Sequence, residues 1–310
     1  MDNMAQDDEP HLLDLAVGIE ATGQREEFDS MGQVMVPAHR YWGAQTQRSL
    51  EHFAIGDDKM PLEICRALCL IKMASARVNA RMGRLPQWKA QAIESAALEG
   101  MDGLLDEHFP LYVWQTGSGT QTNMNVNEVL SNRAIQLLGG VLGSQKPVGP
   151  NDDVNMSQSS NDAFPTAMHL AVVQMCDDRL LPEVQELAQI IERNAVIKWM
   201  DVVKIGRTHL QDAVPLSVGQ EWSGYAAQLR ACLADLITAR QGLYPLALGG
   251  TAVGTGLNAP AGFSEAVAKE LADITGKPFV TDPNKFMALA SQDAIVRFSA
   301  SLRGLAVALI

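Results

Sequence analysis

Residues 117–128 read Gly-Ser-Gly-Thr-Gln-Thr-Asn-Met-Asn-Val-Asn-Glu, two glycines followed by a run of neutral hydrogen-bonding side chains. Glycine lets a ligand approach the backbone closely, and short polar side chains cap helices and bond nearby backbone groups. A helix that begins near Thr120 would offer free N–H groups and partial positive charge to an anion. The alternative is a capped helix whose polar face, with Asn123 and Asn127, is merely solvated, although such a face normally carries Lys and Glu.

We call residues 117–128, 151–162 and 206–212 the first, second and third polar segments. Each combines Ser or Thr with Asn or Gln, and the third adds His209. Brought together, they would form a site rich in neutral donors with one titratable group, as a dicarboxylate requires. An isolated histidine is more often structural than catalytic, but the polar neighbours of His209 keep both interpretations open. Residues 41–48 are either a surface turn or an arginine and amides that hold a carboxylate.

The composition is that of a globular protein with a substantial core: 47% hydrophobic and 19% charged over 310 residues, enough for two domains or one large one. Few aromatic residues and abundant Ala, Leu, Met and Gln favour helix over sheet. The net charge of −12 argues against nucleic acid as a partner, so a small anionic substrate would need locally arranged donors. There is no signal peptide and no apolar run of about 18 residues, so we expect a cytoplasmic protein without a membrane span.

Long helices are expected to carry the polar segments. Apolar residues at helical spacing, several runs opened by proline, predict helices over 61–82, 86–105, 120–140, 165–199, 216–240 and 287–310. Pro182 is expected to kink or break the fourth of these. A short strand or hairpin over 30–37 and a β-branched run over 202–205 interrupt the helical pattern. The predicted class is therefore mainly α, with short strands in an N-terminal helical domain and the first part of a bundle of long helices.

Three regions are predicted along the chain. Residues 1–24 are acidic and aperiodic and are expected to form a mobile extension. Residues 25–160 would form an N-terminal domain, and residues 161–310 a central helical bundle. The last helix ends on the apolar run 305–310 without a Gly or Lys cap, which is rare for a native helix, so the bundle is expected to be incomplete.

Other chemistries fit the sequence less well. The four cysteines lie in apolar surroundings, and Cys65 and Cys69 have no flanking histidine, so reduced buried thiols are expected rather than metal ligands. Ser118 is not in the Gly-x-Ser-x-Gly turn of hydrolases. Residues 254–259 match a loose dinucleotide pattern, but Pro260 follows where a helix should run and no βαβ alternation surrounds it.

Four motifs together resemble the class II fumarases of the fumarase/aspartase superfamily: residues 41–48, 117–125, 157–166 and 206–212. The resemblance runs from about Phe28 to Ile310. Aspartases differ at two places, with Gln where this chain has His209 and Ala-Gly-Thr where it has Ser118-Gly119-Thr120. Argininosuccinate and adenylosuccinate lyases match less well still.

The resemblance implies reversible hydration of fumarate to (S)-malate without metal or organic cofactor, in a homotetramer with sites shared between subunits. It makes His209 a proton donor or acceptor that activates water. The residues that would bind the substrate are Ser118, Gly119, Thr120, Ser159, Ser160, Asn161 and Thr208. A secondary, peripheral dicarboxylate site would include Gly149, Pro150, Asn151 and Asp152, although the family usually has His at the position of Gly149.

The family also carries a mobile Gly-Ser-Ser loop followed by Lys and Asn, which supplies the base and a lysine for the aci-carboxylate. That loop, the rest of the bundle and a small C-terminal domain are not among these 310 residues. The chain by itself is therefore expected not to hydrate fumarate. The alternatives are a truncated product that only binds a dicarboxylate or misfolds, and an aspartase-like ammonia-lyase, against which His209 argues.

Overall fold

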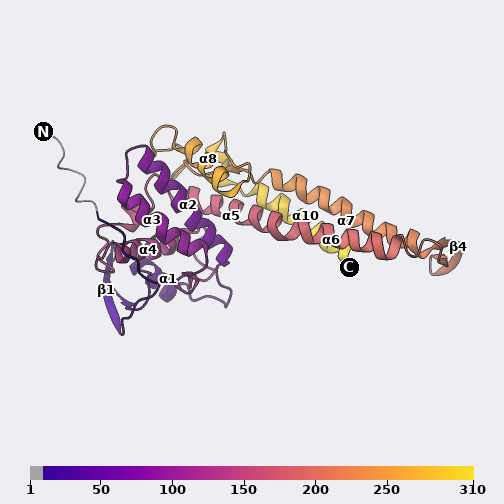
Figure 1. The fold of residues 1–310 in the computed structure, drawn as a ribbon, viewed down its shortest axis with the longest axis horizontal. Coiled ribbons are helices and arrows are strands. Elements are labelled where there is room, and N and C mark those ends of the chain that lie inside the picture. Colours follow the sequence, from indigo (N-terminus) through magenta and orange to yellow (C-terminus); the bar gives the residue numbers. More distant parts are fainter. Residues whose placement is uncertain (1–9) are drawn as a thin grey trace. The chain divides into compact units, whose positions relative to one another are not determined.

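The computed structural model describes residues 10–310, and helices dominate them (Figure 1), which confirms the mainly α class. The helices are α1 (Ala44–His52), α2 (Leu62–Arg81), α3 (Gln87–Met101), α4 (Thr120–Leu137), α5 (Ser160–Met175), α6 (Leu181–Ile191), α7 (Val218–Gln241), α8 (Phe263–Thr275), α9 (Lys285–Ala290) and α10 (Asp293–Leu309). Short helical turns are η1 (Asp106–His108), η2 (Pro150–Val154), η3 (Cys176–Leu180) and η4 (Glu192–Val196). The strands are β1 (Gln24–Asp29), β2 (Gly32–Pro37), β3 (Val203–Thr208), β4 (Gln211–Ser217), β5 (Pro245–Leu246) and β6 (Val280–Thr281). None of these helices is long and apolar enough to cross a bilayer.

Two compact units divide the chain. The first comprises Met1–Ala171 with Pro245–Ser291, and the second comprises Val172–Tyr244 with Gln292–Ile310. Each unit is therefore built from two separate stretches of sequence. The domains predicted over 25–160 and 161–310 remain predictions.

The core of the first unit is built around α2, against which α3 and α4 pack. The helix begins directly after Pro61. Proline has no N–H, but a backbone N–H at the start of a helix has no helical partner, so no hydrogen bond is lost. Every residue from Leu68 to Ala76 is buried, as expected for a helix at the centre of a core. The first three predicted helices are thus confirmed to within a few residues at each end.

A hairpin precedes these helices. Strands β1 and β2 pair antiparallel, with Asp29 opposite Gly32 at the turn. The second strand ends at Pro37, since proline has no N–H to extend the ladder. The strand or hairpin predicted over 30–37 is confirmed.

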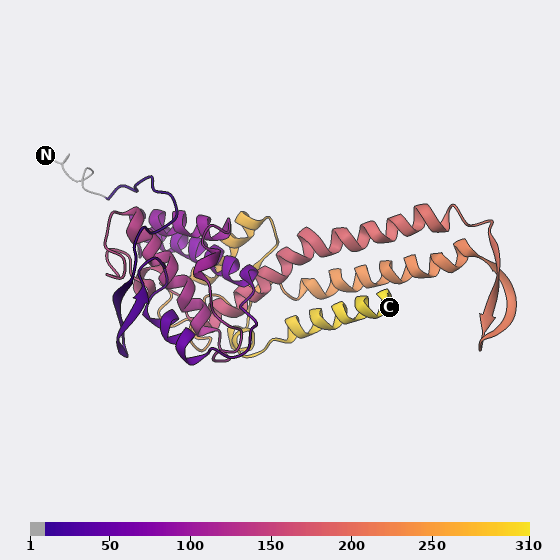
Figure 2. The same ribbon diagram turned by 90° about the horizontal axis from the view of Figure 1, so that it is seen from below.

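The second unit contains α6, α7 and α10, which lie side by side in both views (Figures 1 and 2). A capping box starts α7: the hydroxyl of Ser217 accepts the N–H of Gln220 at 3.1 Å, and the Gln220 side chain accepts the N–H of Ser217 at 2.9 Å. Strands β3 and β4 form an antiparallel hairpin ahead of this helix. The predicted helix over 216–240 and the extended run over 202–205 are confirmed.

Two details of the predicted helices need correction. The helix is not broken at Pro182, because this residue lies in the first turn of α6, directly after the π-helical turn η3; a kink there, the other predicted alternative, remains a prediction. The helix predicted over 287–310 is two helices, since α9 ends at Ala290 and α10 begins only at Asp293. The helix expected from Pro165 also begins earlier, at Ser160.

Residues 1–9 of the predicted mobile extension lie outside the described residues. The described part bonds to α4: the N–H of Leu13 donates to the Leu137 carbonyl at 2.8 Å, and Arg133 donates to the Leu15 carbonyl at 2.6 Å. Tyr41 adds a third attachment, with its hydroxyl 3.0 Å from the carbonyl of Gly18. Mobility of the extension remains a prediction.

Candidate functional site

The first polar segment opens α4. Gly119 precedes Thr120 at φ +71°, a left-handed conformation that glycine adopts without strain. Hydroxyl groups gather here, since Ser118 Oγ lies 2.9 Å from Thr120 Oγ1 and 3.4 Å from Thr116 Oγ1. Ser118 is exposed and Thr120 half-buried, so a ligand can reach both hydroxyls at the positive end of the helix.

The polar face of α4 is buried rather than solvated. Asn123 and Asn127 are both 0% exposed, and Ser131 donates its hydroxyl to the Val148 carbonyl at 2.7 Å. A buried amide needs partners for its oxygen and nitrogen, because water cannot reach it. The alternative of a merely solvated face is therefore wrong, and this face is an interior polar surface.

Side chains of the second polar segment cap the start of α5. The Ser159 hydroxyl accepts the N–H of Asn161 at 3.3 Å, and Asp162 Oδ1 accepts the N–H of Ser159 at 2.9 Å. The other oxygen of Asp162 accepts the N–H groups of Gly249 and Thr251 at 2.9 and 2.7 Å. Burial raises the pKa of Asp162 to about 6, against the opposing effect of the three N–H groups.

The two segments meet through Gly119 and Phe164. A Cβ added at Gly119 would lie 2.2 Å from Cγ of Phe164, so only glycine fits against this ring. Nearby, Asn123 Nδ2 donates to Ser160 Oγ at 3.0 Å. Ser159 and Ser160 are half-buried and Asn161 is exposed. The N-termini of α4 and α5 therefore meet in one region of the first unit.

A buried ammonium lies beneath both segments. Lys72 is 0% exposed, and its Nζ donates to Asn123 Oδ1 and Asn155 Oδ1 at 2.8 Å each and to Gln158 Oε1 at 2.9 Å. Burial lowers the pKa of Lys72 to about 7, against the attraction of Asp162. The sequence-based reasoning gave Lys72 no role. The available signal was a single cation within an otherwise apolar helical run, which is rare unless the charge is partnered.

The third polar segment forms the turn between β3 and β4 in the second unit. His209 and Leu210 have φ of 51° and 62°, and Thr208 pairs with Gln211 across the turn. This is the two-residue mirror-image turn that matches the twist of a hairpin. Thr208 and His209 are exposed. The structure thus brings the first and second segments together in one unit, while the third belongs to the other.

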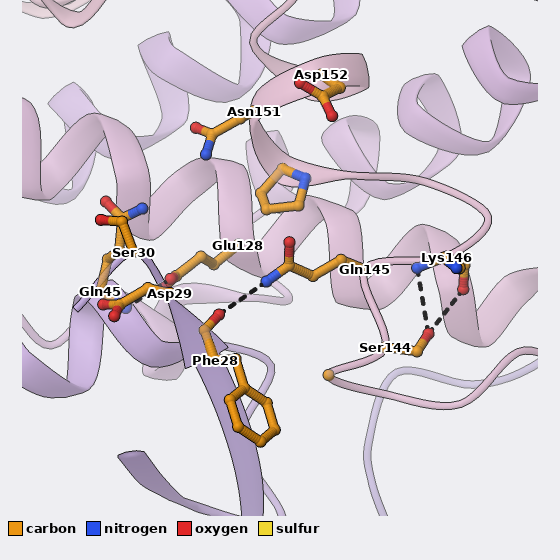
Figure 3. Close-up of a pocket in the computed structure, with 12 residues that line it drawn as sticks. Phe28, Asp29, Ser30, Gln45, Glu128, Ser144, Gln145, Lys146, Asn151 and Asp152 are labelled. Atoms are coloured by element: carbon orange, nitrogen blue, oxygen red, sulfur yellow. Dashed lines mark hydrogen bonds between the residues drawn. The ribbon is translucent and has the colours of Figure 1, made fainter. Parts of the chain in front are cut away.

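A cleft of about 570 Å³ lies beside η2 in the first unit (Figure 3). Pro150, Asn151 and Asp152 line it, three of the four residues predicted for the secondary site. The N–H of Gly149 is occupied, since it donates to Asp153 at 2.7 Å. Figure 3 shows the side chain of Gln145 directed at the carbonyl of Phe28, to which it donates at 3.0 Å.

Glu128, at the end of the first segment, is a buried carboxyl group bound by residues 41–48. The N–H groups at the start of α1 donate to it, and the hydroxyl of Thr46 lies 2.6 Å from its Oε2. Burial raises the pKa of Glu128 to about 7, opposed by these hydrogen bonds. Arg48 pairs instead with Asp29 at 2.8 Å. The surface-turn alternative is wrong, because the Tyr-Trp-Gly start of residues 41–48 is buried. The carboxylate that the backbone N–H groups of this segment bind belongs to Glu128 of the chain itself.

No group of three or more His, Cys, Asp or Glu side chains within residues 10–310 is placed to hold a metal ion. Cys65, Cys69 and Cys232 are free thiols. Cys65, Cys69 and Cys176 are buried, and burial raises the pKa of Cys65 to about 12. These thiols fill the core as small apolar groups.

A protein-family model described as a lyase matches residues 32–310, most of the chain and all three polar segments. The chain belongs to this lyase family. The class II fumarate hydratase of Methanosarcina acetivorans is 62% identical over 301 residues, and the match covers 97% of this lyase chain and 62% of that relative. The class II fumarate hydratase of Thermosynechococcus vestitus is 56% identical, with coverage of 93% and 62%.

Among solved structures, a class II fumarase from Schistosoma mansoni aligns with a TM-score of 0.90 at 44% identity, covering 93% of this chain and 63% of that one. The predicted membership in the class II fumarase family is thereby confirmed. The lyase chain spans about 62% of the length of the curated relatives that it matches.

Proposed function

We propose that this lyase chain provides the dicarboxylate-binding part of a class II fumarate hydratase, which reversibly hydrates fumarate to (S)-malate. The observation that supports this most directly is the meeting of two helix N-termini, at Thr120 and Ser160, linked by the hydrogen bond from Asn123 to Ser160. Both helix ends favour an anion. A protein of net charge −12 binds a dianion only where such local donors outweigh the overall field.

Neutral donors suit the proposed chemistry. Removing a proton beside a carboxylate creates a doubly negative aci-carboxylate, which fixed N–H and O–H groups stabilise in the transition state. Each such donor contributes roughly 2.7–4 kcal/mol in comparable oxyanion sites. The proposed substrate-binding residues are Ser118, Gly119, Thr120, Ser159, Ser160, Asn161 and Thr208.

His209 is proposed to move the proton that activates water, since an imidazole can both accept and donate a proton and so serves both directions of a reversible reaction. Its place on an exposed two-residue turn suits a side chain that reaches a site on another copy of the chain. We propose a homotetramer with shared sites for the whole protein. Exposed apolar side chains on the long helices of the second unit support self-association: Leu187, Ile190, Tyr225, Ile237, Val296 and Val307.

Two further assignments belong to the same proposal. The cleft beside η2 is the proposed secondary dicarboxylate site, with Asn151 and Asp152 at its edge (Figure 3). A cytoplasmic location is proposed because the free thiols of Cys65, Cys69 and Cys232 suit a reducing compartment.

A chimera tests the proposed hydration. The 310-residue chain is assayed for loss of fumarate alone and after extension by the C-terminal part of the Methanosarcina acetivorans relative that it does not span. We expect no turnover by the chain alone and hydration by the chimera. His209→Asn should abolish that activity while preserving the turn, because asparagine tolerates positive φ. A chimera that folds and assembles but produces no malate would refute the proposal.

The same assay separates the alternatives. Loss of fumarate that requires ammonia would indicate an aspartase-like reaction. Turnover by the 310-residue chain alone would show that the additional loop of the family is dispensable. If the 310-residue chain binds fumarate and neither it nor the chimera turns fumarate over, the chain is a truncated product that only binds a dicarboxylate.

A further inference from the structure

Lys72, Asn123 and Ser160 form a continuous line of hydrogen bonds from the core of the first unit to its surface. The ammonium of Lys72 lies 2.8 Å from Asn123 Oδ1, and Asn123 Nδ2 lies 3.0 Å from Ser160 Oγ. The three residues come from α2, α4 and α5. The line ends at a half-buried hydroxyl among the exposed donors of the second polar segment.

The chemistry of each group fixes the direction of donation. An ammonium can only donate, so the oxygen of Asn123 must face Lys72 and its NH₂ must face Ser160. The NH₂ group also can only donate, so the oxygen of Ser160 is the acceptor. The hydroxyl proton of Ser160 then has to point away from Asn123, and no other hydrogen bond occupies it within residues 10–310.

The surroundings of Lys72 favour the charged form. Three amide oxygens surround Nζ, from Asn123, Asn155 and Gln158, and an ammonium has three N–H groups to match them where a neutral amine has two. Burial works against the charge and lowers the pKa of Lys72 to about 7, whereas the buried carboxyl of Asp162 favours it. Asn155 also accepts a second bond, from Asn123 Nδ2 at 3.2 Å, which further fixes the orientation of that amide.

We infer that Lys72 is a positioning residue that acts through Asn123 to keep Ser160 an outward hydrogen-bond donor for a substrate carboxylate. The inference rests on the proposed function for the identity of the ligand. Lys72 does not touch the substrate: it is fully buried, and Asn123 lies between it and Ser160. Positive charge behind the line also polarises each bond toward the ligand.

Two variants separate this role from simple structural support. Lys72→Met removes the ammonium and leaves Asn123 Oδ1 and Gln158 Oε1 without a donor, so it can lower stability. Asn123→Asp is the sharper change, because the new carboxylate still accepts from Lys72 but cannot donate to Ser160. Ser160 must then donate its hydroxyl proton to that carboxylate and can no longer donate it to the ligand. Lys59→Met is the matched control, since Lys59 is exposed and its ammonium donates to the Pro110 carbonyl at 2.7 Å, away from the line from Lys72 to Ser160.

The experiment measures the dissociation constant of fumarate for the folded 310-residue chain by NMR titration. We expect Asn123→Asp, Lys72→Met and Ser160→Ala each to weaken binding about tenfold or more, as loss of one hydrogen bond to a charged group implies. Adding Ser160→Ala to Asn123→Asp should weaken it no further, because both changes remove the same donor. Lys59→Met should bind as the unaltered chain does. Unaltered fumarate binding by folded Asn123→Asp, beside weakened binding by Ser160→Ala, would overturn the inference.

A second measurement does not depend on fumarate. The side-chain NH₂ resonances of Asn123 should shift in both Lys72→Met and Ser160→Ala and stay in place in Lys59→Met. If the Asn123 resonances do not shift in Lys72→Met, the positioning role is overturned even if fumarate binds. If the unaltered chain binds no fumarate while these resonances shift as expected, the line from Lys72 to Ser160 stands and the proposed ligand fails.

Discussion

The backbone of Gly119 lies directly against the ring of Phe164, which joins the start of α4 to the first turns of α5. A Cβ at Gly119 would be 2.2 Å from Cγ of that ring, and the residue has φ +71°. Packing and backbone conformation therefore both require glycine here. Because the two polar segments meet at this contact, its geometry decides how their donors are arranged.

Gly119→Ala should lower the free energy of unfolding by about 2–5 kcal/mol. The left-handed conformation costs an L-residue about 1–2 kcal/mol, and overpacking against Phe164 adds about 1–3 kcal/mol. Urea unfolding followed by circular dichroism measures the difference. Gly117→Ala is the control, since a Cβ there meets nothing within 4 Å, and it should change stability by about 0.5 kcal/mol or less. Equal stability of the two variants would contradict the steric argument.

Glu128→Gln should remove a pH dependence of stability between about pH 4.5 and pH 7. Burial raises the pKa of Glu128 from 4.5 to about 7, so the folded chain binds this proton more tightly than the unfolded chain. Between these values the unfolded carboxyl is ionised and the folded one is protonated, so the free energy of unfolding falls as pH rises. The fall is about 3 kcal/mol and ends near pH 7, above which both states are ionised.

The measurement is urea unfolding of the unaltered chain and Glu128→Gln at several pH values from 4.5 to 8. The quantity compared is the free energy of unfolding of the unaltered chain minus that of Glu128→Gln, in which other titrating groups, Asp162 among them, cancel. We expect this difference to decrease as pH rises and to become constant above about pH 7. A difference that is constant with pH, or that increases, would mean that hydrogen bonds from α1 offset the burial of Glu128.

The sequence predicts the elements whose signals are local. Proline at position 61 and apolar residues at helical spacing define α2, and the segment from Ser217 to Gln220 carries its capping box in four consecutive residues. The break before α10 was missed, because Ser291 and Gln292 interrupt a helical pattern without a proline or glycine. The sequence does not distinguish a kink from a break at Pro182, because a proline in a first turn resembles one in an interior until the start of the helix is known.

The polar segments were recognised from composition, but what holds them was not. Lys72 reaches Asn155 and Gln158, more than 80 residues away in sequence, and no local pattern encodes such a partnership. Likewise, Asp162 is buried and accepts the N–H groups of Gly249 and Thr251, partners that lie far away in sequence. Side-chain types indicate the groups proposed to bind the ligand, while tertiary contacts determine which polar groups support them.

Leu210→Gly should stabilise the hairpin of the second unit by about 0.5 kcal/mol. Leu210 has φ of 62° and is 92% exposed, so the substitution relieves a left-handed conformation and loses almost no packing. The relief of about 1–2 kcal/mol is offset in part by the greater entropy that glycine loses on folding, about 0.5–1 kcal/mol. Hydrogen exchange of the cross-strand N–H groups of β3 and β4 reports the change. Gln211→Gly, where φ is not positive, should have the opposite sign, and matching signs would contradict the turn assignment.

Arg133→Lys should destabilise the first unit and release the described part of the N-terminal extension. Arg133 is fully buried, and its guanidinium bonds both oxygens of Glu99 at 2.6 Å and the carbonyl of Leu15 at 2.6 Å. The ammonium of lysine cannot reproduce this planar set of donors. The carboxylate of Glu99 and the carbonyl of Leu15 would therefore lose hydrogen bonds that Arg133 now donates. Breaking a buried pair costs about 3–5 kcal/mol, and retention of the charge should reduce the loss to roughly 2–3 kcal/mol.

Two measurements check the Arg133 prediction: urea unfolding for stability, and hydrogen exchange of the Leu13 N–H, which bonds to the Leu137 carbonyl at 2.8 Å. We expect Leu13 to exchange faster in Arg133→Lys by more than the global loss of stability explains, because the neighbouring attachment at Leu15 is gone. Arg84→Lys makes the same change at an exposed arginine and should leave both measurements unaltered. Faster exchange in step with global unfolding alone would show that α4 holds the extension without Arg133.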